Sequence, residues 1–290
     1  MLLESRLTIA SYPGGKSDKK KHQPLFQAVP LNISYLVEPF AGLANFFLVV
    51  SPRVKQVWLN DKDPEVFALL KCIKEPDLLD KLIEYIHSIN PVERDEYYQW
   101  KKSNPRELLE QAVRRLVILN CSPNGAGGGY SNLKAHRKWY TNKPKAWKQI
   151  HAIFAEKKVE ITNWDYLEVF KSLNDFKDKE AIFLYLDPPY FDVAQRGSLY
   201  GRGFNTIDWE ELKTLLRDLP SHWILSNRDI KDMRDLFSEP EFHILRYNTY
   251  NDMNNTQNKN PELIVSNKPL QFKENKIRAL DKFLKADHQN

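Results

Sequence analysis

The chain has 290 residues and a mass of 34.1 kDa, enough to bury a core as one large α/β domain or as one domain with a smaller insertion. Its 42% hydrophobic and 12% aromatic content excludes a disordered chain, and no apolar run approaches the roughly 20 residues of a membrane helix. The net charge of +5 is mild, and two cysteines, Cys72 and Cys121, are too few for a disulfide framework or a cysteine-rich zinc site, so we predict reduced thiols and no metal.

The N-terminal part of the chain predicts strands that alternate with helices. Its first residues, MLLESRLTIASYPGG, lack the basic start and apolar stretch of a signal peptide, so we expect a cytoplasmic protein. YLVEPF (35–40) and KQVWLND (55–61) predict strands, whereas GLANFFLVV (42–50) and PEVFALLKCI (64–73) predict helices. Such alternation is typical of parallel βαβ units.

The middle of the chain predicts helices only. From about Glu75 to Leu119 the apolar spacing is helical, with no strand candidate. The segment ends in NCSPNGAGGGYSN (120–132), where Pro123, Gly125 and Gly127 to Gly129 are predicted as loop. We therefore predict a catalytic domain made of residues 1–74 and 156–290, interrupted by an inserted, mostly helical domain of residues 75–155.

Five further strands follow, and they complete an open α/β sheet. A helix is expected at DWEELKTLLRDL (208–219). In sheets of this kind, ligands bind at the carboxyl ends of strands, near the point where the strand order reverses. The predicted strands are KVEIT (158–162), AIFLYL (181–186), HWILSN (222–227), FHILRYN (242–248) and ELIVSN (262–267).

Positive charge is concentrated in the inserted segment. No acidic residue occurs between Glu110 and Glu156, and Trp139, Tyr140 and Trp147 are interleaved with the cations. A positive field with flat aromatic faces favours a polyanion that carries stackable bases, although a solvated basic helix beside a loop is the alternative. The basic residues are Arg114, Arg115, Lys134, Arg137, Lys138, Lys143, Lys145 and Lys148.

Two residues at the ends of the first strands indicate a nucleoside-containing cofactor. In EPFAG, Gly42 permits a tight turn that brings the backbone close to a ligand. Asp61 ends the second strand, where a carboxylate can accept hydrogen bonds from ribose hydroxyls, or can simply cap the following helix. The G-x-G-x-x-G pattern of a dinucleotide site is absent.

The stretch AIFLYLDPPYF ends a buried strand with a carboxylate and two prolines. Asp187, Pro188 and Pro189 present a carboxylate oxygen beside a rigid carbonyl oxygen, and Tyr190 adds a flat ring. Two converging acceptors suit an NH₂ group. Accepting both protons of an exocyclic amine frees its lone pair, a stabilisation that grows toward the transition state. A purely structural Asp-Pro-Pro turn is the alternative.

Together these motifs resemble the Dam-like, D12-class DNA adenine-N6 methyltransferases. SYPGGK (11–16), VEPFAG (37–42), LNDKD (59–63) and DPPY (187–190) occur in the order of that family. NCSPNGAGGGYSN, ILSNRD (224–229) and NPELIVSN (260–267) extend the resemblance over nearly the whole chain. The resemblance implies a Rossmann-like S-adenosylmethionine-dependent methyltransferase sheet with an inserted helical DNA-recognition domain.

The resemblance also implies roles for individual residues. Asp187, Pro188, Pro189 and Tyr190 would be catalytic. Asp165 would accept from the adenine amino group of the cofactor, or would serve only as a helix N-cap. The residues expected to bind S-adenosylmethionine are Tyr12, Lys16, Phe40, Gly42, Asp61, Asp165 and Asp187.

The implied reaction moves the sulfonium methyl group directly to N6 of an adenine flipped out of duplex DNA, without a covalent enzyme intermediate. Residues of the insertion would grip phosphates and read neighbouring bases. We expect a monomer, and any cognate restriction endonuclease would act separately. The expected DNA-binding residues are Arg114, Arg115, Asn124, Lys134, Arg137, Lys138, Trp139, Tyr140, Lys143 and Lys145.

Two departures from the family pattern, and two alternative functions, stay open. Ala44 replaces a second glycine of the cofactor loop, and glycines replace the arginine that Dam uses for site recognition, so we do not infer GATC specificity. The alternatives are a methyltransferase that acts on an RNA adenine or a protein glutamine, and a catalytically silent DNA-binding relative.

Overall fold

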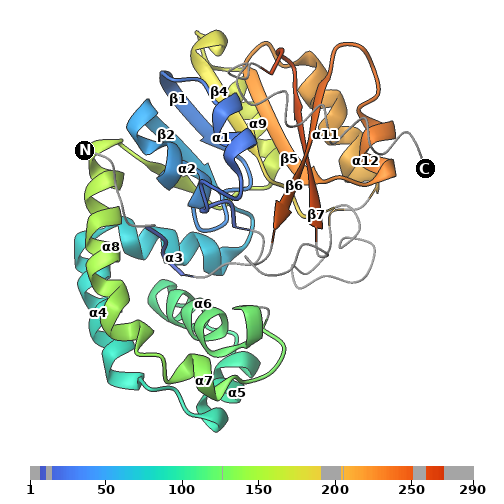
Figure 1. Cartoon of the computed structure of the whole chain (residues 1–290). Coiled ribbons are helices and arrows are strands. Elements are labelled where there is room, and N and C mark those ends of the chain that lie inside the picture. The colour runs from blue at the N-terminus through green and yellow to red at the C-terminus, as the bar shows by residue number, and fades with distance from the viewer. Residues whose placement is uncertain are drawn as a thin grey trace.

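The computed structural model describes residues 7–10, 15–125, 127–190, 204, 206–250 and 259–270. A twisted central sheet carries helices on both faces, and a further group of helices lies beside it (Figure 1). All the predicted strands are present, and the expected α/β sheet is confirmed. The strands are β1 Ile33–Glu38, β2 Val54–Asn60, β3 Glu160–Thr162, β4 Ile182–Leu186, β5 His222–Arg228, β6 His243–Tyr250 and β7 Lys259–Ser266.

The sheet has the strand order β3-β2-β1-β4-β5-β7-β6. The first five strands of this order are parallel, whereas β7 pairs antiparallel with both of its neighbours, β5 and β6. The order 3-2-1-4-5 is that of a Rossmann-like doubly wound sheet, and it reverses between β1 and β4. The carboxyl ends of these two strands therefore define the expected ligand crevice.

Alternation along the strands divides the buried side chains between two faces of the sheet. Leu36 and Tyr185 pack in one core with α1, α2 and α3, whereas Val37 and Leu184 pack in the other core with α9, α11 and α12. The result is a three-layer α/β/α arrangement. These helices are α1 Gln23–Ala28, α2 Asn45–Val50, α3 Pro64–Lys74, α9 Tyr166–Leu173, α11 Thr206–Asp218 and α12 Lys231–Leu236.

The helix predicted from residue 42 begins later, at Asn45. Gly42 and Ala44 have φ angles of 50° and 55°, which belong to the left-handed region, so the right-handed helix cannot begin before Asn45. The predicted helix 64–73 is confirmed as α3, which the side chain of Asp63 caps by accepting from the backbone N–H groups of Glu65 and Val66.

Between β2 and β3 the described residues form helices and loops only. Helices α4 to α7 gather beside the sheet, and the long α8 returns from this group to it (Figure 1). The residues predicted as loop, Pro123, Gly125 and Gly127–Gly129, lie between α6, which ends at Cys121, and α7, which starts at Asn132, and the first two belong to a short 3-10 helix. The elements are α4 Pro76–Ile89, α5 Arg94–Lys102, α6 Leu108–Cys121, η2 Pro123–Gly125, α7 Asn132–Ala135 and α8 Trp139–Glu156.

The helical segment and the sheet share one hydrophobic core. Leu116 of α6 and Trp147 of α8 belong to the same buried cluster as Leu59 of β2 and Tyr185 of β4. Trp147 also donates from Nε1 to the carbonyl oxygen of Ile9, at 2.8 Å, which fixes α8 against the N-terminal segment. None of the helices in the described part of the chain is long and apolar enough to cross a membrane.

Candidate active site

The carboxyl ends of β4 and β5 meet around Asp187, the first residue after β4. Lys16 donates from Nζ to both carboxylate oxygens of Asp187, at 3.1 and 3.2 Å. Ser226 of β5 donates to Asp187 Oδ1 at 3.1 Å. The structure therefore brings together two motifs that lie 171 residues apart, GGK and DPPY.

Lys16 is a buried ammonium group that is held by several acceptors. Besides Asp187, it donates to the hydroxyl of Tyr190 at 3.1 Å, and it lies 3.9 Å from Glu262 Oε2. Burial alone would lower the pKa of Lys16, but the negative field of Asp187, Tyr190 and Glu262 outweighs burial and holds this pKa well above its usual range. Lys16 is therefore a permanent cation beside the Asp187 carboxylate.

Glu38, the last residue of β1, is a site residue that the sequence interpretation missed. It is 1% exposed, and its Oε1 atom has no hydrogen-bond partner among the described residues. Burial raises the pKa of Glu38 well above its usual value, and the negative charge of Asp187 raises it further. The sequence signal that could have identified Glu38 is its position in the VEPFAG motif (37–42), directly at the end of a predicted strand.

The charge balance at this edge fits the expected cofactor. Asp187 and Glu262 lie beside the ammonium group of Lys16, and Glu38 lies in the field of Asp187. Two carboxyl oxygens, Glu38 Oε1 and Glu262 Oε2, have no hydrogen-bond partner among the described residues. A buried orphaned acceptor in a negative field favours a cationic ligand. S-adenosylmethionine carries a sulfonium and an ammonium group, so these residues suit it.

Asp61 lies where the second strand ends, as expected. Its Oδ2 accepts from the backbone N–H of Gly42 at 2.8 Å, and its Oδ1 accepts from the N–H of Asp63 at 2.9 Å. Burial raises the pKa of Asp61 to about 6, although the Gly42 N–H and Arg115 oppose the shift. The alternative that Asp61 caps a helix is wrong, because Asp63 caps α3.

Asn60 joins the ends of three strands beside Asp61, a role that the sequence interpretation also missed. Its side-chain amide donates to the carbonyl oxygens of Pro39 and Trp164, both at 3.0 Å. Its Oδ1 accepts from Thr162 Oγ1 at 2.8 Å. Because Asn60 is fully buried, these bonds fix the loops after β1, β2 and β3 relative to one another.

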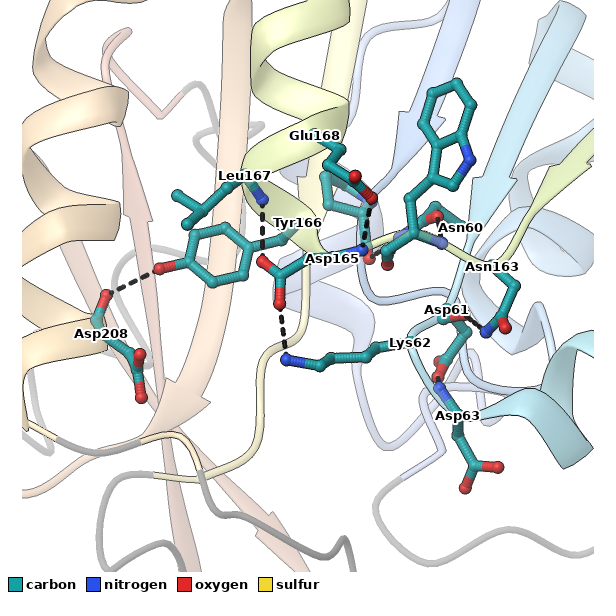
Figure 2. A network of polar contacts seen from close by, with 12 residues as sticks. Asn60, Asp61, Lys62, Asp63, Asn163, Asp165, Tyr166, Leu167, Glu168 and Asp208 are labelled. Atoms are coloured by element: carbon teal, nitrogen blue, oxygen red, sulfur yellow. Dashed lines mark hydrogen bonds and ion pairs between the residues drawn. The ribbon is translucent and has the colours of Figure 1, made fainter.

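Asp165 is both an N-cap and a residue of the crevice. Its Oδ1 accepts from the backbone N–H of Leu167 at 3.1 Å, which confirms the capping alternative, and Glu168 completes a capping box. Its Oδ2 lies 2.5 Å from Nζ of Lys62, which reaches across from the end of β2 (Figure 2). The cap uses Oδ1 and the ion pair uses Oδ2, so capping does not occupy both carboxylate oxygens.

Phe40 follows β1 and belongs to an aromatic group on the Asp165 side. Its ring centroid lies 5.5 Å from that of Tyr166 and 5.7 Å from that of Phe204. The cluster gives the crevice an apolar wall next to the Asp165 carboxylate. Tyr12 lies outside the described residues.

Two of the residues expected to contact DNA, Arg114 and Arg115, form ion pairs within the protein. Arg114 pairs with Glu65, and Arg115 pairs with Asp63 and Glu65, so both guanidinium groups connect α6 to the first turn of α3. Arg114 also donates to the carbonyl oxygens of Trp100 and Lys101. Because these groups already have internal partners, we do not include them among the residues that would contact phosphates.

The remaining basic residues differ in exposure. Trp139 is buried, and Lys143 donates to the carbonyl and the hydroxyl of Thr8, both at 2.9 Å. Lys134 is partly buried and donates to the Ser122 carbonyl at 2.9 Å. Arg137, Lys138 and Lys145 are exposed, Tyr140 is partly exposed, and the Asn124 side chain lies outside the described part of the structure.

Both cysteines are buried and reduced, in α3 and α6. Burial raises the pKa of the Cys72 thiol and of the Cys121 thiol to about 12, so neither is a ready nucleophile.

The sequence of the chain matches one family of known proteins and resembles one of the curated methyltransferases. Residues 12–253 match the family of D12 class N6 adenine-specific DNA methyltransferases. The type II methyltransferase M.CviBI of Paramecium bursaria Chlorella virus NC1A is 24% identical over 193 residues, which cover 64% of this chain and 69% of that protein.

Solved structures give weaker likenesses. Precorrin 8w decarboxylase of Methanobacterium thermoautotrophicum has a TM-score of 0.41 at 10% identity, over 88% of this chain and 92% of that one. An rRNA methylase of Streptococcus thermophilus has a TM-score of 0.35 at 10% identity, over 86% and 95%. Since the family match spans most of the sequence and includes GGK, EPFAG and DPPY, the chain belongs to the D12 class of S-adenosylmethionine-dependent, N6 adenine-specific DNA methyltransferases.

Proposed function

We propose that Asp187, with Pro188, Pro189 and Tyr190, forms the methyl-acceptor site for an adenine flipped out of duplex DNA. The observation that carries the proposal is the cluster in which the buried Lys16 holds the partly exposed Asp187 and Tyr190, after the carboxyl end of β4. S-adenosylmethionine, when bound, supplies an electrophilic sulfonium methyl group. We assign its binding to Lys16, Phe40, Gly42, Asp61, Asp165 and Asp187, with Tyr12 as an expectation from the sequence.

Asp187 would act as an acceptor and not as a nucleophile. Lys16 contacts both of its oxygens and Ser226 contacts Oδ1, so Oδ2 keeps acceptor capacity for one proton of an adenine amine. The rigid carbonyl group of Pro188 would accept the other proton. Drawing both N6 protons toward acceptors localises the nitrogen lone pair, and this stabilisation increases as the N6–methyl bond forms.

The helical segment, residues 75–155, would bind the DNA. Its exposed cations Arg137, Lys138 and Lys145 lie on α8 and the turn before it. The internal pairs of Arg114 and Arg115 tie α6 to α3, whose N-terminus follows Asp61, so the segment is braced against the cofactor side of the crevice. We propose that the chain acts as a monomer and independently of any companion endonuclease.

The first test is transfer of tritiated methyl groups to unmethylated duplex DNA, followed by chromatography of the product nucleosides. Label in N6-methyladenine supports the proposed acceptor site. The same assay is repeated with RNA and with protein as the acceptor. Label in one of these and none in DNA would assign a different amine, and cofactor binding without transfer to any acceptor would indicate a silent DNA-binding relative.

The DNA-binding role has its own test. Replacing Arg137, Lys138 and Lys145 with Ala should reduce the slope of log K against log salt by about 2 to 3, because each phosphate contact contributes roughly 0.9. Lys55→Ala, at an exposed position near the opposite end of β2, is the matched control and should leave the slope unchanged. An unaltered slope in the triple variant would contradict the assignment.

A further inference from the structure

The antiparallel strand β7 brings an acidic residue to the catalytic edge of the sheet. Glu262 lies near the start of β7, opposite Arg228 of β5 in one register and opposite Tyr247 of β6 in the other. A strand that runs against β5 places its first residues where the parallel strands end. In the sheet, β7 lies between these two neighbours.

Glu262 holds the hydroxyl group of Tyr190. The phenol donates to Glu262 Oε1 at 3.0 Å and accepts from Lys16 Nζ at 3.1 Å. A phenol has one proton to donate, so these two bonds fix the rotation of the hydroxyl group and the tilt of the ring. Tyr190 is thus oriented by β7 from one side and by the GGK motif from the other.

The burial of Glu262 argues against an incidental contact. The residue is 7% exposed, and its second oxygen, Oε2, has no hydrogen bond from the described residues apart from its 3.9 Å ion pair with Lys16. Burial raises the pKa of Glu262, whereas Lys16 lowers it and Asp187 raises it. A buried carboxyl group is unfavourable unless it is paired, so its two partners in the active site account for its presence there.

We propose that Glu262 is a positioning residue that orients the Tyr190 ring for the extrahelical adenine before DNA binds. The inference rests on the proposed roles of Asp187 and Tyr190. A ring fixed in advance needs no ordering when the base arrives, which favours binding and alignment of the base. Glu262 itself touches neither the adenine nor the methyl group.

A double-mutant cycle between Glu262→Met and Tyr190→Phe tests the proposal. Met has a similar length and removes both oxygens, whereas Phe keeps the ring and removes the hydroxyl. We expect Glu262→Met to lower kcat/KM for DNA roughly 10- to 100-fold, the range for a hydrogen bond to a charged group. In the Tyr190→Phe background the same change should lower it less than about threefold, because the bond is already gone.

Two further measurements separate positioning from general damage. Glu262→Gln retains an acceptor oxygen and should restore kcat/KM to within about fivefold of the parent chain. The affinity for S-adenosylhomocysteine, measured by calorimetry, should change less than about fivefold in Glu262→Met, because Lys16 keeps its bonds to Asp187. Thermal unfolding confirms that each variant is folded, and Glu262→Ala replaces the Met variant if that one unfolds.

Equal losses in both backgrounds, or a Gln variant as impaired as the Met variant, would overturn the role of Glu262. These outcomes differ from failure of the proposed function, in which the unaltered chain itself places no label in N6-methyladenine.

Discussion

The two halves of the crevice are built in different ways. On the proposed cofactor side, Asp61 is held by backbone N–H groups of Gly42 and Asp63, from loops that follow β1 and β2. On the proposed catalytic side, Asp187 and Tyr190 are held by side chains from distant parts of the chain, Lys16 and Glu262. Backbone contacts within a local motif survive most substitutions, whereas a buried network of side chains depends on each member.

The largest difference should appear when each half loses its lysine. Lys16→Met removes a buried cation and leaves Asp187 and Glu262 without their shared partner, so the free energy of unfolding should fall by about 3 kcal/mol. Lys62→Met breaks an ion pair with Asp165 in which the lysine side chain is 78% exposed, and it should change stability by less than about 1 kcal/mol. Urea unfolding of both variants measures the contrast.

A Lys16 variant as stable as the Lys62 variant would show that the catalytic network adds little to folding. The Lys16 variant should also lose more activity than the Lys62 variant, because Lys16 orients Asp187 and Tyr190, whereas Lys62 pairs with Asp165, which caps α9.

Substitutions of Asp187 test its proposed role as a hydrogen-bond acceptor for the adenine amine. Asp187→Ala removes an acceptor aimed at charge that develops in the transition state, and kcat should fall roughly 100- to 1000-fold. Asp187→Asn keeps one acceptor oxygen for Lys16 or for the amine and should lose less. Single-turnover methylation of duplex DNA gives the rate, and circular dichroism checks the fold. Near-normal turnover of the Ala variant would contradict the proposed acceptor role.

The pH dependence of cofactor affinity tests the proposed role of Asp61. Its carboxylate form accepts from hydroxyl groups, so cofactor affinity should rise as pH increases through about 6, the raised pKa of the free protein. Stability should move the other way, because a folded-state pKa above the unfolded value of 3.8 means that this group's contribution is lost as pH rises from about 4 to 6.

Calorimetry with S-adenosylhomocysteine between pH 5 and 8 measures the cofactor affinity. Asp61→Asn should weaken binding about tenfold at pH 7.5 and flatten the dependence. A chain whose affinity does not vary with pH across this interval would contradict the assignment of Asp61. Arg115 and the Gly42 N–H are the groups that lower this pKa, so both are retained in the measurement.

The same contrast explains how much of the molecule could be predicted from the sequence. The strands, α3 and the positions of Gly42, Asp61 and Asp187 follow from local patterns of apolar, turn and acidic residues. The family resemblance assigned Lys16 and Asp187 to the same cofactor, but their direct pairing was not predicted, since 171 residues separate them.

Other parts of the site depend on tertiary packing. The sequence around Glu262 predicts a strand but gives no sign of a site residue. Glu262 lies near Asp187 and Tyr190 because β7 pairs antiparallel with β5. Arg114 and Arg115 show the reverse case, because their charge predicted phosphate contacts, whereas the packing of α6 on α3 gives them internal partners. Charge in a sequence does not reveal which charges become paired on folding.

The smallest effect is expected at Ala44, where the cofactor loop departs from the family pattern. Ala44 has a φ of 55°, and relief of left-handed strain in Ala44→Gly would stabilise the chain by about 1–2 kcal/mol. The greater freedom of unfolded glycine opposes this by about 0.4–1 kcal/mol. Loss of the buried methyl group opposes it by about 0.8 kcal/mol.

These three contributions nearly cancel, so Ala44→Gly should change the free energy of unfolding by less than about 0.5 kcal/mol. Gly42→Ala, at a φ of 50°, adds left-handed strain next to the N–H that contacts Asp61, and it should lower stability by about 1–2 kcal/mol. Urea unfolding and S-adenosylhomocysteine affinity measured on both variants compare the two positions. Equal effects would mean that the loop is held by Asp61 and Asn60 irrespective of its own backbone preference, whereas a loss confined to Gly42→Ala would assign the conformation of the cofactor half to that single glycine.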